Sequence, residues 1–233
     1  MKIIFFLLSY LLLPSLSSAE NLGQLDADAR ILVLDSTNTT RQRFDDSTVY
    51  EYLNQGMRQA VAQSYCLEQN IVFSLVPGIQ YYTLPSNYEE ITRVTIGQKY
   101  IPQQSVAALD GKSRGWEAAT GYPTYYFINF SSRSLIGFAP FPATATDTDT
   151  IKVEFNIAPT DMVLTTDLPF NGISELQVYD HMLAYYAAAI MAQVNDMSEQ
   201  AKDYMSIYTS LLTTMSQKCM AQGQYLPSAS ASP

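Results

Sequence analysis

Positive charge is scarce in this chain of 233 residues, which has 13 lysines and arginines against 22 aspartates and glutamates. The formal net charge at pH 7 is −9. Proteins that grip nucleic acid do so with clustered lysine and arginine side chains, whereas the small basic spot at Arg41 and Arg43 is too sparse to read DNA. The charge balance remains compatible with an acidic wall past which DNA slides without adhering.

Recognisable catalytic motifs are also missing from the sequence. His181 is the single histidine, and no nucleophile or second ligand stands at a spacing that would serve it. No serine has a Gly-x-Ser-x-Gly setting, and no glycine-rich phosphate loop is present. Asp147 and Asp149 lack the rest of a calcium loop. We therefore expect no enzyme activity, no cofactor and no metal site, with His181 a structural or interface residue.

Cysteine is limited to Cys66 and Cys219, and their spacing matches no metal motif. In an exported chain the two could pair, whereas in a reducing compartment they would be two free thiols on helix faces. We favour free thiols that face apolar surroundings.

After the N-terminus, no segment is apolar enough to cross a bilayer. Residues 3–16 are almost wholly apolar, follow the positive charge of Lys2, and precede the small residues of 17–19. This order is typical of a secretory signal peptide cleaved after Ala19, and the run is short for a membrane span. A start site placed too early in the gene would give the same pattern. A genuine leader would make the protein secreted or periplasmic.

Two helices are expected before residue 70. The first covers residues 24–34. The second begins at a cap formed by Asp46 or Ser47 and continues to Cys66, because apolar residues recur at intervals of four. Gly56, inside this second helix, indicates a close packing contact.

The period then changes to the alternation of strands. Expected strands lie at 71–76, 81–85, 91–96 and, as three runs, within 121–156, with a short arm at 98–103. Pro77-Gly78 is expected to join the first two as a hairpin. Residues 105–120 are expected to be irregular or weakly helical, and they carry Trp116, the single tryptophan.

Helix returns after Pro169, with Asn171 as its cap, and a last helix follows the interruption at Asn195-Asp196. We predict an α+β fold, in which a bundle of about four helices (two N-terminal, two long C-terminal) carries an inserted antiparallel β module. The expected parts are a leader (1–19), N-terminal helices (20–69), the β-rich insertion (70–168), a C-terminal helical pair (169–222) and a flexible tail (223–233).

Five motifs in a fixed order carry a resemblance. They are Leu53-Asn54, Tyr82-Thr83-Leu84-Pro85, Gly121-Tyr122-Pro123-Thr124-Tyr125-Tyr126, the strand and Pro-x-Pro of 135–142 followed by 151–159, and Leu168-Pro169-Phe170 before a long helix. In this order the chain resembles the head-to-tail adaptor proteins of tailed bacteriophages, also called head completion or connector proteins. The resemblance covers about residues 24–222.

The resemblance implies a structural virion protein. Members of that family form a ring, dodecameric in the family, beneath the portal, where it joins the capsid vertex to the tail and surrounds the DNA channel. The implied partners are the portal protein, tail or nozzle proteins and further copies of the chain. DNA would pass without specific binding, and no membrane would be involved in the assembled state. The implied location is the virion, assembled in the host cytoplasm.

Aromatic and tail residues are the expected partner contacts. Tyr125 and Tyr126 put one ring on each side of a strand, so one ring can fill a core while the other meets solvent or a partner. The resemblance implies that the tail from Gln222 orders on the portal, which a segment with nothing to bury can do only once docked. The residues that we expect to bind partners are Tyr225, Leu226, Pro227, Tyr125 and Tyr126.

Two other interpretations stay open. The leader motivates an exported soluble binding or surface module, processed after Ala19, which predicts an N-terminus at Glu20 and a Cys66–Cys219 disulfide. A secreted hydrolase is the third interpretation, and a loss of turnover in His181→Ala would support it. The adaptor is the interpretation that we adopt.

Overall fold

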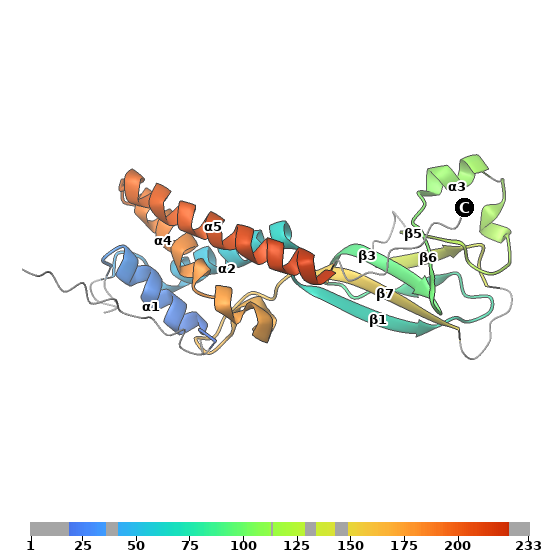
Figure 1. Ribbon diagram of the computed structural model, residues 1–233, viewed down its shortest axis with the longest axis horizontal. Helices are drawn as coiled ribbons and strands as arrows, with labels where there is room; N and C mark the ends of the chain where they lie inside the picture. The colour runs from blue at the N-terminus through green and yellow to red at the C-terminus, as the bar shows by residue number, and fades with distance from the viewer. Residues whose placement is uncertain (1–18, 36–41, 113, 129–133, 143–148, 224–233) are drawn as a thin grey trace, which may run out of the picture. The chain divides into compact units, whose positions relative to one another are not determined.

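The computed structural model describes residues 19–35, 42–112, 114–128, 134–142 and 149–223 (Figure 1). It has the predicted α+β fold and divides into two compact units. The first, called here the helical unit, holds the chain up to Ala60 and again from Thr160 to Gln217. The second, called here the sheet unit, holds Val61–Pro159 and the chain from Lys218 onward.

Four helices build the helical unit: α1 (Leu22–Leu32), α2 (Asp46–Ser64), α4 (Met182–Val194) and α5 (Ser198–Gly223), the last residues of α2 and α5 being counted with the sheet unit. α4 is buried along nearly its whole length. A helix that is apolar on all sides is typical of one covered by several neighbours. α1 contacts α4, and Tyr186 of α4 packs against Tyr208 of α5 with ring centroids 5.0 Å apart (Figure 1).

The starts of α1 and α2 are set by side-chain caps. Asn21 accepts a hydrogen bond from the backbone N–H of Gln24, whose side chain accepts one in return from the N–H of Asn21. The predicted cap of α2 was wrong by one residue, because Asp45 accepts from the N–H of Thr48 at 2.8 Å. Asp46, one of the two residues predicted for that role, binds a buried arginine instead.

The helix predicted directly after Pro169 is also wrong. Two 3₁₀ turns, η2 (Pro169–Gly172) and η3 (Ser174–Tyr179), precede α4. Asn171 has a φ of 56°, in the left-handed region, and its side chain accepts from the N–H of Thr160 rather than capping a helix. Phe170 also has positive φ and is fully buried. Burial of this ring therefore outweighs the helical period of the following residues.

The sheet unit contains two antiparallel sheets. The first has the order β1 (Glu68–Ser74), β7 (Thr150–Ile157), β3 (Tyr88–Ile96), β4 (Lys99–Tyr100), and the second has the order β2 (Tyr81–Thr83), β6 (Leu135–Ala139), β5 (Tyr125–Ile128). β7 alternates as predicted, with Ile151, Val153 and Phe155 buried.

The predicted hairpin through Pro77-Gly78 does not form, since β1 pairs with β7 and β2 pairs with β6. The N–H of Gly78 donates to the carbonyl of Pro142 at 2.8 Å, so this turn is bonded to a distant segment. Pairing with β7 sets Ile71 opposite the buried Val153. Long-range burial therefore decides the pairing rather than the short connection.

A small aromatic core lies beside the second sheet. It includes α3 (Val106–Lys112) and the 3₁₀ turn η1 (Trp116–Ala118), in the segment predicted to be irregular or weakly helical. Trp116 meets Phe127 edge to face with ring centroids 5.0 Å apart, and its indole N–H donates to Asp110 at 2.8 Å. Gly137 allows this packing, since a Cβ there would overlap the Phe127 ring.

Cys66 and Cys219 form a disulfide whose Cα atoms lie 5.4 Å apart. The preference for free thiols was therefore wrong. Tyr65, with a φ of 54°, ends α2 and turns the chain before Cys66. The helical period that seemed to include Cys66 could not reveal this turn, nor a partner 153 residues away.

Within the described part of the chain, no helix is both long and apolar enough to span a membrane. The leader up to residue 18 lies outside the described residues.

Candidate interface site

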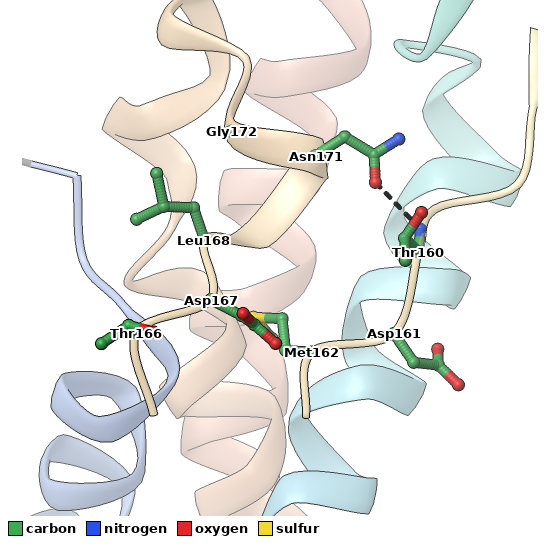
Figure 2. Close-up of a pocket in the computed structure, with 8 residues that line it drawn as sticks. All are labelled: Thr160, Asp161, Met162, Thr166, Asp167, Leu168, Asn171 and Gly172. Atoms are coloured by element: carbon green, nitrogen blue, oxygen red, sulfur yellow. Dashed lines mark hydrogen bonds between the residues drawn. The ribbon is translucent and has the colours of Figure 1, made fainter. Parts of the chain in front are cut away.

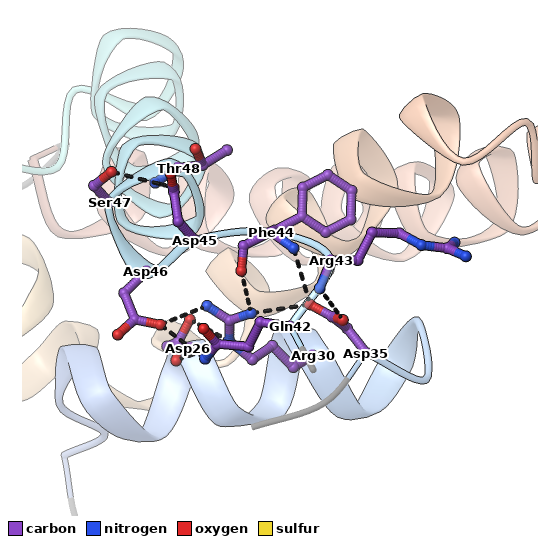
Figure 3. A network of polar contacts seen from close by, with 10 residues as sticks. All are labelled: Asp26, Arg30, Asp35, Gln42, Arg43, Phe44, Asp45, Asp46, Ser47 and Thr48. Carbon is purple, nitrogen blue, oxygen red and sulfur yellow. Dashed lines mark hydrogen bonds and ion pairs between the residues drawn. The ribbon is translucent and has the colours of Figure 1, made fainter. Parts of the chain in front are cut away.

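The first polar feature of the helical unit is a buried arginine network near its N-terminal helices (Figure 3). Arg30, on α1, has no exposed surface. Its Nε contacts Asp26 at 2.9 Å, and its Nη1 donates to Asp35 and to the carbonyl of Phe44, each at 2.9 Å. Its Nη2 donates to Asp46 at 2.8 Å. One guanidinium thus joins α1 to the first residues of α2.

Direct contacts with carboxylates balance the positive charge of Arg30 in this network. Burial alone would lower the pKa of Arg30, but its hydrogen bond with Asp26 and the nearby charges of Asp46 and Asp35 raise it overall. Burial raises the pKa of Asp26, against the opposing effect of Arg30. The Asp26–Arg30 spacing of four on a helix is the one sequence signal that could have found the site. The predicted basic spot contributes a backbone N–H, from Arg43 to Asp35, while Arg41 lies outside the described residues.

The second feature is the loop of residues 160–168, which borders a pocket of 440 Å³ (Figure 2). The pocket is lined by Thr160, Asp161, Met162, Thr166, Asp167, Leu168, Asn171 and Gly172. Asn54, a residue of α2, binds the backbone of this loop through two hydrogen bonds. Its side-chain amide donates to the carbonyl of Met162 at 2.9 Å and accepts from the N–H of Met162 at 2.8 Å. The Leu-Asn motif therefore serves to fix this loop.

Asp167 orders the rest of the loop. Its carboxylate accepts from the N–H groups of Val163 and Leu164, each at 2.7 Å, and these bonds lower the pKa of Asp167. α1 is tied to the same loop, since the N–H of Leu22 donates to the carbonyl of Asp167 at 2.9 Å. The loop is thus held from α1 and α2 at once.

The ordered loop presents apolar side chains to solvent. Val163 is 71% exposed and Leu164 is 64% exposed. Exposed apolar side chains gathered on a fixed backbone are typical of protein contact sites. We call Val163 and Leu164 the loop pair. Sequence reasoning missed this site, because two apolar residues in a short loop carry no period.

The tyrosines predicted to contact partners differ from each other in burial. Tyr126 is buried, and burial raises its pKa to about 12. Tyr125 is half-buried, with the Lys112 ammonium 4.4 Å from its ring centroid. Partner contact by either residue stays a prediction. Tyr225, Leu226 and Pro227, the other predicted contacts, lie outside the described residues.

His181, the residue considered for catalysis, lies in the helical unit. His181 is half-buried directly before α4, burial lowers its pKa, and its ring faces Tyr185 at 6.3 Å. Across the described ranges, no three histidine, cysteine, aspartate or glutamate side chains are placed to hold a metal ion. Asp147, one of the two aspartates considered for a cation, lies outside those ranges.

Two of the motifs noted in the sequence meet in the sheet unit. The N–H of Gly121 donates to the carbonyl of Phe141 at 2.9 Å, and the N–H of Thr124 donates to the carbonyl of Ala139 at 3.1 Å. The Gly-x-Pro-x-x-Tyr segment therefore lies along the Pro-x-Pro segment. Motifs that are far apart in sequence but bonded in the fold form one structural unit.

Comparison with protein families decides what this arrangement belongs to. A model described as SU10 adaptor protein matches residues 20–231. The chain belongs to this phage adaptor family. No curated protein matches it. The adaptor match spans both units and includes the loop pair, the Arg30 network and both cysteines. An adaptor of this family is a structural component of a phage virion and, in general terms, interacts with portal and tail proteins.

Proposed function

We propose that this adaptor assembles with copies of itself into a ring beneath the portal, joins the capsid vertex to the tail and surrounds the DNA channel. The observation that carries the proposal is the family match over residues 20–231. The net charge of −9 supports the channel, because an acidic surface repels the phosphate backbone of passing DNA. A dodecamer is the expected ring.

We assign the loop pair to contacts between subunits or with the portal. Such a role explains why the fold keeps these two apolar side chains exposed to solvent. Hydrogen bonds from Asn54, from Asp167 and from the start of α1 hold their loop in place. Rigid presentation favours binding, because little side-chain and backbone freedom is lost on association.

The assembly experiment mixes the adaptor with its portal protein and measures the particles by native mass spectrometry and electron microscopy. We expect rings of adaptor on the portal. Changing Val163 and Leu164 together to aspartate should abolish them. Val178→Asp is the matched control, since Val178 is also exposed and lies in the same unit but outside the loop. A wild-type adaptor that stays monomeric beside the portal contradicts the proposal.

The tail is tested by truncation. A chain that ends at Gln224 should lose portal binding, whereas a chain that ends at Pro227 retains Tyr225, Leu226 and Pro227 and should keep it. Equal binding by the two chains would remove these residues from the interface. Tyr125→Ala tests the sheet unit in the same assay, with Tyr100→Ala as an exposed tyrosine control.

For the second candidate function, the exported binding module, one observation is relevant. The Cys66–Cys219 disulfide is the bond that this interpretation predicts. Disulfides persist in oxidising surroundings, which include both the periplasm and the exterior of a released virion. The bond is therefore compatible with both functions, and binding to the portal separates them.

A further inference from the structure

Leu34 is an apolar side chain that the fold holds in solvent on a strained backbone. It lies just beyond α1 and is 93% exposed. Its φ of 56° is in the left-handed region, which glycine usually occupies at the end of a helix. Packing within the unit does not offset this strain, because the side chain is almost fully exposed. Strained residues of this kind persist where their surroundings fix them, and they gather at functional sites.

The Arg30 network fixes Leu34 in this conformation. The N–H of Leu34 donates to the carbonyl of Ile31 at 3.2 Å. The N–H of Asp35 donates to the carbonyl of Arg30 at 2.9 Å, which completes a Schellman turn. An apolar contact often closes such a turn, whereas here the side chain of Asp35 accepts from Nη1 of the buried Arg30 at 2.9 Å. Leu34 is therefore presented rigidly.

A positive charge accompanies Leu34. The backbone N–H of Arg43 donates to the side chain of Asp35, the residue after Leu34, at 2.9 Å. The Arg43 side chain is exposed, and Figure 3 shows it extending away from the Arg30 network. The surface at this end of α1 thus combines one apolar side chain with one cation.

The pocket beside the loop of residues 160–168 lies at the other end of α1. The N–H of Leu22 donates to the carbonyl of Asp167, and the N–H of Gly23 donates to the carbonyl of Thr165 at 3.0 Å. α1 has 11 residues, which makes it about 16 Å long. A rigid helix therefore separates Leu34 from the pocket of its own copy, so that only another molecule can bring a side chain there.

The pocket suits an apolar side chain. Met162, which is buried, and Leu168, which is 39% exposed, both line it. Its volume of 440 Å³ has room for a leucine side chain and part of the backbone that carries it.

The charge of the pocket is opposite to that beside Leu34. Asp161 and Asp167 line the pocket, and Figure 2 shows Asp161 and Leu168 on opposite sides of it. Arg58 pairs with Asp161 but is shared with Glu51, so these residues together carry negative charge. Charge complementarity therefore favours an arginine-bearing surface as the occupant.

We propose that Leu34 of one adaptor copy inserts into the pocket of a second copy, with Arg43 directed toward the acids of that pocket. The two surfaces differ, so the contact is heterologous, and repeated contacts of this type close into a ring when the rotation between copies permits. The inference rests on the ring given above as the proposed function, and it adds the residues that join neighbouring subunits.

The first experiment repeats the portal assembly assay with substitutions at Leu34. Leu34→Gly should reduce adaptor rings about tenfold or more, whereas Leu34→Met should keep them. Glycine fits the left-handed backbone, so the Tm of Leu34→Gly should stay equal or rise, which separates lost contact from lost folding. Val178→Asp is again the control, since Val178 is exposed and does not line the pocket.

The two possible failures can be told apart. Wild-type levels of rings in Leu34→Gly overturn the inference and leave the ring intact. Absence of rings from the wild-type chain contradicts the proposed function itself.

A cross-link identifies the surface that receives Leu34. A chain with both Leu34→Cys and Thr166→Cys is assembled on the portal and treated with a short bismaleimide. Thr166 lines the pocket, and the two native cysteines do not react because they are paired. We expect a ladder of adaptor multiples on a denaturing gel, whereas each single substitution should give dimers at most. Rings visible by electron microscopy without a ladder overturn the inference.

Charge reversal tests the role of Arg43. Arg43→Glu should weaken ring formation on the portal severalfold, with a larger loss at low salt, because it places like charges together. Arg114→Glu is the matched control, since it changes the net charge equally and Arg114 is exposed in the sheet unit. Equal losses from the two substitutions contradict the charge contact.

Discussion

The interactions that stabilise the interior of the helical unit differ from those that stabilise the interior of the sheet unit. In the helical unit, Arg30 and Asn54 are buried and each binds several named acceptors or donors. In the sheet unit, aromatic rings meet edge to face, as Trp116 meets Phe127, and a disulfide closes the unit. The stabilisation from a buried polar network is lost when any one of its hydrogen-bonding partners is removed, whereas the stabilisation from apolar packing depends on how well the side-chain shapes fit. The helical unit should therefore lose most from one changed group.

Arg30→Met gives the largest expected effect. It leaves Asp26, Asp35 and Asp46 close together without their cation, and breaking a buried ion pair from one side costs about 3–5 kcal/mol. The measurement is urea unfolding followed by circular dichroism at the helical wavelength. Arg58→Met is the control, because the exposed pairs of Arg58 with Glu51 and Asp161 are worth at most about 1 kcal/mol. Equal losses from the two substitutions contradict the comparison.

Replacing Cys66 and Cys219 together by serine is the next largest change. Loss of a native disulfide that closes a long loop costs about 2–4 kcal/mol. Trp116 is the single tryptophan and belongs to the sheet unit, so its fluorescence follows this unit alone. Its unfolding midpoint should fall, and dithiothreitol should lower the wild-type midpoint by the same amount. Titration of two free thiols in the untreated protein would contradict the bond.

Glycine-to-alanine substitutions compare close packing in the two units. A Cβ at Gly137 would overlap the Phe127 ring, and a Cβ at Gly56 would lie 2.9 Å from the Tyr186 ring. Overpacking costs about 1–3 kcal/mol, and at Gly56 the better helix propensity of alanine offsets about 1 kcal/mol of it. Gly137→Ala should therefore cost more than Gly56→Ala in urea unfolding. Phe127→Leu should restore part of the loss from Gly137→Ala and none of the loss from Gly56→Ala.

Gly111→Ala should have the smallest effect and the opposite sign. Gly111 lies on α3, and a Cβ there would meet no atom within 4 Å. Alanine is favoured over glycine in a helix by about 1 kcal/mol at most, so stability should rise slightly. The midpoint of Trp116 fluorescence in urea is the measurement. A loss of stability would show that α3 is packed more tightly than the described contacts indicate.

The sequence was most informative where a local period decides the structure. The α+β class, the helix that begins near Asp46 and the alternation of β7 follow from periods of 3.6 and 2, which neighbouring residues report directly. The hairpin through Pro77-Gly78 was predicted wrongly because strand pairing depends on burial against β7, which follows more than 70 residues later in the chain.

Sequence patterns could not predict most of the candidate site. The motif Leu53-Asn54 pointed to Asn54, but only the fold shows that it binds Met162. The positive φ at Phe170, the pairing of the two cysteines and the acceptors of Arg30 each depend on residues distant in sequence. Such contacts leave no period, and Asp26–Arg30 alone has a local spacing.

The disulfide also changes the connectivity of the polypeptide. Residues 66–219 form a closed covalent circle from which only two ends emerge. A protease that cuts once inside the circle releases no fragment, because both sides of the cut remain attached through sulfur. Such a nicked adaptor would run as one molecule on a non-reducing gel and as two on a reducing gel. A virion component built in this way stays in one covalent piece after a single cut inside the circle, and single cuts release only segments that lie outside it.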